Sequence, residues 1–140
     1  MSSGKVHFSV SITAAIPLAA ASILTTVTTH DPAMLGLALG ALTGCIVTPD
    51  NDHEWTTESE QVVYRVSKPL GAMWELFWRP YDLLHAHRGS SHTYPVGTLV
   101  RFLYLFWLPI LLWPQPMFWL LAFVGVSVSD LLHLWYDDLL

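Results

Sequence analysis

Four long apolar runs limit what this chain can fold into. They cover residues 8–29, 33–48, 96–113 and 117–134. An α-helix rises about 1.5 Å per residue, so about 20 apolar residues cross a hydrocarbon core about 30 Å thick. The runs therefore predict an all-α fold: an integral membrane bundle of about four transmembrane helices, built as a single membrane domain over residues 1–140.

The composition favours the same class of protein. Hydrophobic residues make up 53% of the chain and charged residues only 12%, whereas soluble domains carry roughly 25% charged residues. The formal net charge of −5 argues against a nucleic-acid partner, because phosphates require a basic surface. The single cysteine, Cys45, excludes an internal disulfide and a cysteine-built metal cage. Histidines and carboxylates remain as the candidate metal ligands.

The second run carries glycines at a regular interval. Gly36, Gly40 and Gly44 are four residues apart, so they lie on one face of a helix and predict close packing against another helix in lipid. Because run 33–48 is short for a span, we expect it to end at depth or beside other protein.

The first run can be read in two ways. Lys5 followed by apolar residues resembles a signal peptide, with the alanines at 19–21 as a cleavage site. The run continues past these alanines without a polar break, which favours a retained helix. After it, Asp31 and Pro32 predict a helix stop and restart, with Asp31 as the cap and Pro32 in the first turn.

A long polar segment separates the second and third runs. We expect residues 49–95 to hold a polar stretch, then an amphipathic, aromatic-rich interfacial helix over 69–85, kinked or split at Pro80, and finally a loop. Four spans place this segment and both termini on one side of the membrane. Under the positive-inside rule that side is cytoplasmic, because it holds every basic residue: Lys5, Arg65, Lys68, Arg79, Arg88 and Arg101.

The same topology gathers the candidate metal ligands at the cytoplasmic face. On the last run, spacings of three and four residues put Asp130, His133 and Asp137 on one helix face. Asp130 lies where the run is still apolar, so its carboxylate requires a partner, which a divalent cation would supply. The other candidates start the first span, follow the second or precede the third: His7, Asp50, Asp52, His87 and His92.

Each candidate also has a reading without metal. Asp50 is able to cap the second helix, His7 is an ordinary interface residue, and the end of the fourth run is able to form a polar network alone. Nitrogen with carboxylate oxygen suits zinc first, and manganese or iron as alternatives. There are more ligands than one ion needs, so two ions or spectator residues remain open.

Four elements in order carry a resemblance to a known family. They are the histidine that follows the N-terminal Met-Ser-Ser-Gly-Lys-Val, the Pro-Asp-Asn-Asp turn at 49–52, the His-Arg-Gly-Ser-Ser-His loop at 87–92 and the His-to-Asp element at 133–137. The chain resembles a bacterial family of uncharacterised metal-binding membrane proteins. It is also similar to inner-membrane metal-dependent hydrolases of the LexA-binding type. The resemblance implies a metal site made by His7, Asp50, Asp52, His87, His92, His133 and Asp137; Asp130 is added from its spacing.

Two functions follow as hypotheses. The first is a metal-dependent hydrolase of a phosphoester or lipid-like substrate in a bacterial inner or thylakoid membrane. His87 or His92 would then bind metal or donate a proton, and Arg88 would hold phosphate oxygens. Arg88 is otherwise a positive-inside anchor. The second hypothesis is a non-catalytic metal-binding subunit, with lipids and a protein partner or a second copy around it.

Overall fold

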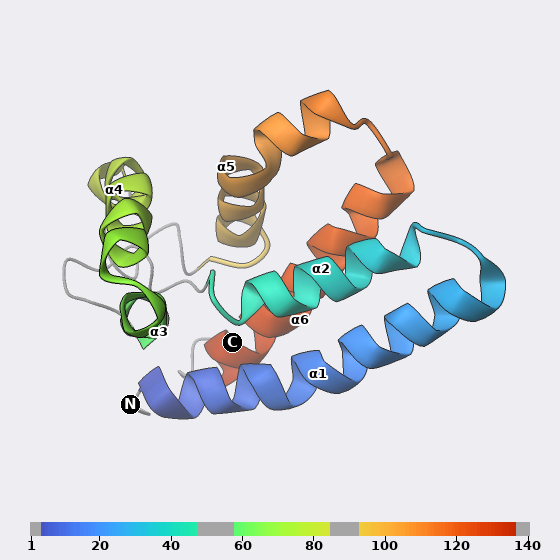
Figure 1. Cartoon of the computed structure of the whole chain (residues 1–140), viewed down its shortest axis with the longest axis horizontal. Helices are drawn as coiled ribbons and strands as arrows, with labels where there is room; N and C mark the ends of the chain where they lie inside the picture. Colours follow the sequence, from blue (N-terminus) through green and yellow to red (C-terminus); the bar gives the residue numbers. More distant parts are fainter. Residues whose placement is uncertain (1–3, 48–57, 85–92, 137–140) are drawn as a thin grey trace.

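The computed structural model describes residues 4–47, 58–84 and 93–136. Over these ranges it contains six α-helices and no strand (Figure 1). The predicted all-α class is therefore confirmed for the described part of the chain. The helices are α1 (Gly4–Thr29), α2 (Met34–Gly44), α3 (Glu58–Val66), α4 (Lys68–Leu84), α5 (Val96–Leu112) and α6 (Pro116–Tyr136).

The four apolar runs correspond to α1, α2, α5 and α6, and the predicted interfacial helix corresponds to α4. Pro80 lies inside α4 without ending it, so it does not split the helix, and the alternative of a kink at this proline stays a prediction. The sequence pattern does not predict helix α3, because its segment is rich in charged and polar residues. A nine-residue helix is marginal alone and depends on tertiary packing, which the ring of Tyr64 provides by lying against Gly71 of α4.

Two helices are long and apolar enough to cross a membrane. They are Phe8–Thr29 within α1 and Pro116–Tyr136, whereas the apolar helices α2 and α5 are shorter. The second run is therefore short for a membrane span, as predicted. Buried core helices and N-terminal signal sequences share the length and composition of these two helices, so span length alone does not establish four crossings.

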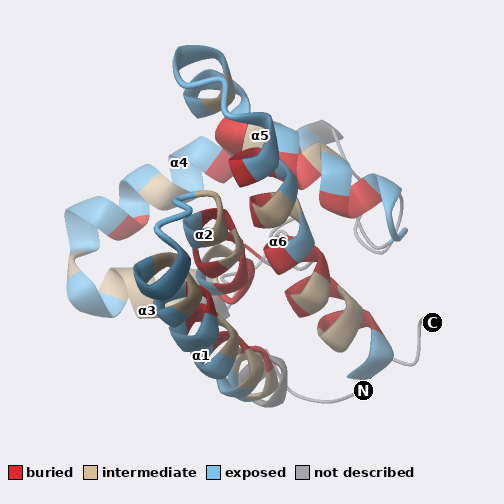
Figure 2. Ribbon diagram, turned by 90° about the vertical axis from the view of Figure 1, so that its right-hand side faces the viewer, coloured by how far each residue is buried: buried red, intermediate tan, exposed pale blue. Residues whose placement is uncertain are grey.

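Glycines bring α2 and α6 into backbone contact. A Cβ atom on Gly40 would lie 1.9 Å from the carbonyl oxygen of Ala122, and one on Gly36 would lie 2.0 Å from that of Phe118. On α6, a Cβ on Gly125 would lie 2.5 Å from the backbone of α2. Real Cβ atoms do not approach so closely, so only glycine fits. Buried residues are concentrated along both helices here (Figure 2), and the predicted close packing is confirmed.

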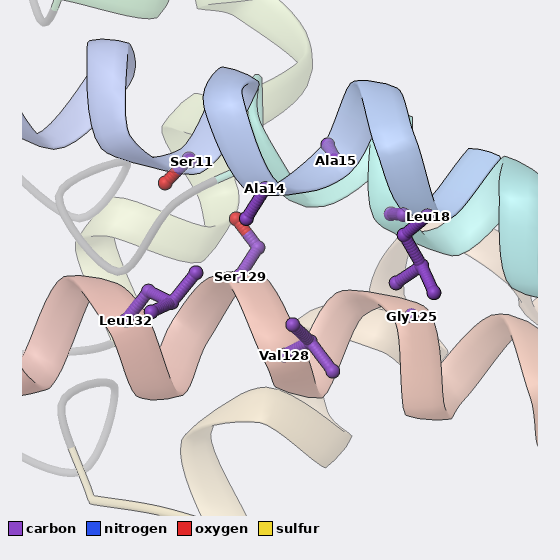
Figure 3. A pocket seen from close by; sticks show the side chains of 9 residues that line it. Ser11, Ala14, Ala15, Leu18, Gly125, Val128, Ser129 and Leu132 are labelled. Carbon is purple, nitrogen blue, oxygen red and sulfur yellow. The ribbon is translucent and has the colours of Figure 1, made fainter. Parts of the chain in front are cut away.

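The pairing of residues fixes the helix directions. Gly36 meets Phe118 and Gly44 meets Ser129, so α2 and α6 run parallel. The helix α1 runs the other way. Along the crevice between α1 and α6, Ser11 lies towards Leu132 and Leu18 lies beside Gly125 (Figure 3).

The helix α5 is also antiparallel to α6. The ring of Phe106 packs on Trp119 and the ring of Phe102 packs on Phe123, while Thr98 reaches further along α6 to Asp130. The starts of α1 and α5 and the ends of α2 and α6 therefore gather at one end of the bundle, which we name the convergent end.

The link between α1 and α2 lies at the opposite end. His30 has a positive φ of 57°, and its backbone N–H donates to the carbonyl of Thr26 at 2.8 Å, which ends α1. The carboxylate of Asp31 then accepts the N–H of Ala33 at 2.9 Å, with Pro32 between them. The predicted stop is confirmed. Asp31 holds the turn that leads into α2, but the helix begins at Met34 with Ala33 as its N-cap residue and without a side-chain cap, so Asp31 and Pro32 lie before the helix.

An aromatic cluster fastens α4 to the bundle. The buried side chains of Trp78 and Tyr81 pack with Tyr104 of α5 and with Val47 just after α2. The hydroxyl of Tyr104 donates to the carbonyl of Phe77 at 2.5 Å. In Figure 1 α4 is seen nearly end-on while α1 and α2 run lengthwise, and in Figure 2 it runs across the view. It therefore crosses α1 and α2 steeply.

The glycine contact gives a stability prediction. Gly40→Ala adds one methyl group against the backbone of α6, and overpacking of this kind costs about 1–3 kcal/mol or more. We expect this loss in denaturant unfolding followed by circular dichroism in detergent, although alanine is the better helix former. The control is Leu42→Ala on the same helix, since Leu42 is 46% exposed. An unchanged midpoint for Gly40→Ala would contradict the contact.

Candidate functional site

A buried ion pair joins α5 to α6 near the convergent end. The guanidinium of Arg101 donates to Oδ2 of Asp130. The Thr98 hydroxyl donates to the same oxygen at 2.5 Å. The side chains of Arg101 and Asp130 are 1% and 0% exposed, so both charges are removed from solvent.

The expectation that Asp130 requires a partner is confirmed, and the partner is Arg101. A charge in an apolar interior is held only when a counter-charge and hydrogen bonds compensate for its lost hydration. Arg101 supplies the charge and Thr98 adds a neutral donor. A cation is therefore not needed to neutralise this carboxylate, and metal ligation by Asp130 stays a prediction.

The sequence contained a signal for this pair. Thr98 and Arg101 are three residues apart, so both lie on one face of α5. A charged residue inside an apolar run usually faces a partner in the bundle interior. The positive-inside rule by itself uses Arg101 only as a marker of membrane side. Asp130 is the only acidic residue in the other three apolar runs, so the sequence itself offers it as the partner of Arg101.

The second carboxylate oxygen of Asp130 has a different environment. Oδ1 is buried and accepts no hydrogen bond from the part of the chain that the structure describes. His133 follows one helical turn later on the same face and is only 2% exposed. Asp130 and His133 thus place an oxygen and a nitrogen donor at the buried end of α6, a donor set that suits zinc, manganese or iron.

The end of α2 is held beside this region. The hydroxyl of Ser129 donates to the carbonyl of Gly44 at 2.7 Å, which satisfies one of the carbonyls that a helix leaves without an intrahelical partner. Val47 is buried in the aromatic cluster with Trp78 and Tyr81. These contacts fix the point from which the chain continues towards Asp50.

The crevice between α1, α2 and α6 is not a ligand site. It is lined mainly by small and aliphatic side chains, among them Ala15, Ala41 and Val128 (Figure 3). Its open space has no room for a water molecule. It is a packing gap.

The remaining sequence candidates cannot be placed by their side chains. His7 belongs to α1, but its side chain lies outside the described residues, and so do all the other candidates. Within the described side chains, no three histidines, cysteines or acidic residues gather closely enough to hold a metal ion. The candidates outside the described residues are Asp50, Asp52, His87, Arg88, His92 and Asp137.

Comparison with protein families decides the affiliation. A family model described as "Uncharacterized metal-binding protein (DUF2227)" matches residues 2–137. The chain belongs to this family. The DUF2227 match covers all six helices and every candidate ligand, so metal binding is a property of the family to which the whole described bundle belongs.

The family description says nothing of a membrane or of hydrolysis. Searches of curated proteins and of solved structures found no match to the chain. For this DUF2227 member, the family description therefore supports metal binding. It does not extend to the identity of the metal, the reaction or the membrane location.

The buried pair predicts a coupled effect on stability. Asp130→Leu or Arg101→Met alone leaves one buried charge without its partner, which costs about 3–5 kcal/mol. The double variant removes both charges, so we expect its free energy of unfolding in detergent to lie close to that of the wild type. As a control, Thr98→Val loses one hydrogen bond and costs about 1 kcal/mol. Additive losses in the double variant would mean that the two charges do not interact.

Proposed function

We propose that this protein is a membrane-embedded metal-binding protein that holds a divalent cation at the convergent end. The family supports metal binding. The observation that carries the location is that four helix ends meet where Asp130 and His133 are buried on α6.

Chain connectivity supports this location. Asp137 directly follows the last residue of α6, Asp50 is three residues beyond Val47, and His92 directly precedes Thr93. Consecutive Cα atoms are about 3.8 Å apart, so each of these candidates is attached within a short reach of the convergent end. His7 belongs to the first turns of α1, at the same end.

Within this proposal Asp130 has two roles, one for each oxygen. Oδ2 is held by Arg101 and Thr98, which fixes the orientation of the carboxylate. Oδ1 is then available to the metal, or to a histidine that binds it. Groups that orient a metal ligand in this way govern both affinity and geometry. Arg101 and Thr98 are therefore positioning residues.

We propose a hydrolase of phosphoester or lipid-like substrates as the activity. A bound divalent cation supplies Lewis-acid activation of water at neutral pH. His87 or His92 would donate a proton to the leaving group, and Arg88 would bind phosphate oxygens in a bidentate manner.

A non-catalytic subunit is the second candidate. The ion pair of Arg101 and Asp130 favours it, because this pair fastens two helices together without any metal. An open coordination position separates the two candidates, since a catalytic metal keeps a place for water or substrate and a structural metal does not.

Exposed apolar side chains support the membrane location. Leu24 and Val27 of α1 are each 64% exposed, and Leu111 and Leu112 of α5 are 70% and 76% exposed. The 21 residues of α6 span about 30 Å at 1.5 Å per residue. Trp113, just before this helix, and Trp135, near its end, are 45% and 64% exposed, as is usual for tryptophans at the two membrane interfaces. We propose four spans in a bacterial inner membrane, with the convergent end cytoplasmic.

Metal content tests the site. We expect plasma mass spectrometry of detergent-purified protein to find bound zinc, manganese or iron that is lost in His92→Ala and in Asp50→Ala. The matched control is His30→Ala, because His30 is exposed at the opposite end of the bundle. It should keep the metal.

Full retention of metal by both His92→Ala and Asp50→Ala would refute the ligand assignment. If metal is lost as expected, phosphoester hydrolysis by the wild type then separates the enzyme from the subunit.

The topology has its own test. In a Cys45→Ala background, cysteines introduced at Lys5, Glu58 and Asp138 should react with a membrane-impermeant thiol reagent from the cytoplasmic side. A cysteine at Asp31 should react from the other side. Four spans require this pattern, so labelling of the first three positions from different sides would rule the four-span arrangement out.

A further inference from the structure

The helix α4 carries an apolar row that nothing in the described part of the molecule covers. Its large side chains are 40–79% exposed: Leu70, Met73, Leu76, Phe77 and Leu83. A contiguous apolar surface of this kind marks a contact with another protein or with lipid.

The bundle touches this row only at one edge, where the ring of Phe77 packs on Tyr104. The main attachment of α4 is the neighbouring stripe, where Trp78 and Tyr81 are 2% and 1% exposed and pack with Tyr104. Most of the row therefore faces away from the interior that stabilises the fold, and no described residue covers it.

The charges of α4 are arranged in order around the helix. Lys68 and Arg79 are eleven residues apart, which is three turns, so they share one line along the helix. Glu75 and Asp82 are seven residues apart, which is two turns, and form an acidic line. At 3.6 residues per turn, Arg79, Lys68, Glu75 and Asp82 follow one another around the helix in steps of about 20°, so the acidic line directly adjoins the basic line on the side away from the apolar row. The order is apolar, basic, acidic.

A groove between α3 and α4 adds a second basic residue beside Lys68. It has an open volume of about 720 Å³ and is lined by Gln61, Tyr64, Arg65, Lys68 and Glu75. The Tyr64 hydroxyl donates to Glu75 at 2.7 Å, and chiefly this hydrogen bond raises the pKa of Tyr64, so the phenol stays protonated. The side chains of Arg65, Lys68 and Arg79 form no ion pair with any described residue.

We propose that α4 docks on an anionic lipid surface, with its apolar row among the acyl chains and with Arg65, Lys68 and Arg79 on lipid phosphates. This proposal rests on the membrane location proposed above, because α4 crosses α1 and α2 steeply (Figures 1 and 2) and so lies along the surface if α1 spans. Basic side chains at the border of an apolar row reach the phosphate layer, where they are attracted to anionic lipids.

The order of charges selects lipid over a protein occupant. A layer of phosphates lies just outside the acyl chains, and it matches a basic line next to the row with acids held further away. A second copy of α4 packed antiparallel on the row would instead place its own basic line against the same line of its partner.

Quenching by spin-labelled lipid tests the proposal on the full chain. A bimane label is attached to the cysteine of a Met73→Cys variant in a Cys45→Ala background. The labelled protein is placed in nanodiscs of phosphatidylcholine with or without phosphatidylglycerol. Lipids spin-labelled near the head group should quench this label strongly, and more so with phosphatidylglycerol. The matched control is Glu75→Cys on the acidic line, which should be quenched little. Lys68→Gln with Arg79→Gln should remove the gain that phosphatidylglycerol gives.

A label at Leu24→Cys on α1 separates failure of this proposal from failure of the membrane location. Quenching at Leu24 by lipids spin-labelled along the acyl chain, without quenching at Met73, would overturn the docking of α4 and leave the spans in place. Quenching at neither position would overturn both proposals. A Met73 label shielded from a water-soluble quencher but not reached by spin-labelled lipid would show a protein on the row. Equal quenching in the two lipid mixtures would remove the role of the anionic phosphates.

Discussion

The backbone contact between α2 and α6 is the constraint on which the rest of the structure depends. Gly40 leaves no room for a single methyl group against Ala122, so the two helices have one register. That register places the end of α2 beside the polar end of α6, where Ser129 bonds to Gly44. The antiparallel helices α1 and α5 then bring their first turns to the same end, where the metal centre is proposed.

The helix α5 is attached by a different force. Large aromatic rings separate it from α6 along most of the contact, as Phe102 does against Phe123, and the pair of Arg101 and Asp130 fixes its first turns. Such a pair is costly to break and contributes specificity more than net stability. In the proposed metal centre, Arg101 and Thr98 would hold the carboxylate in position through Oδ2 of Asp130, and Oδ1 would be left for the metal.

The convergent end also brings two kinds of chemistry together. The proposed metal lies beside α6, and the helix α4, proposed to lie on lipid phosphates, is fastened to the same end through Tyr104 and Val47. A phosphoester of an amphipathic molecule would be presented at this surface, so the location of α4 and the proposed substrate class agree.

The sequence by itself determined features that depend on local pattern: the four apolar helices, the glycine face on α2, the helix stop before Asp31 and the helix α4. Hydrophobic period, residue size and backbone preference are readable without neighbours. The candidate ligands were chosen from spacing and resemblance, and most of them lie outside the described residues. Only the tertiary structure decided that α3 is helical, that α2 and α6 run parallel, and that Asp130 pairs with Arg101 across two helices. These depend on contacts between segments far apart in the chain, whose energies no local pattern contains.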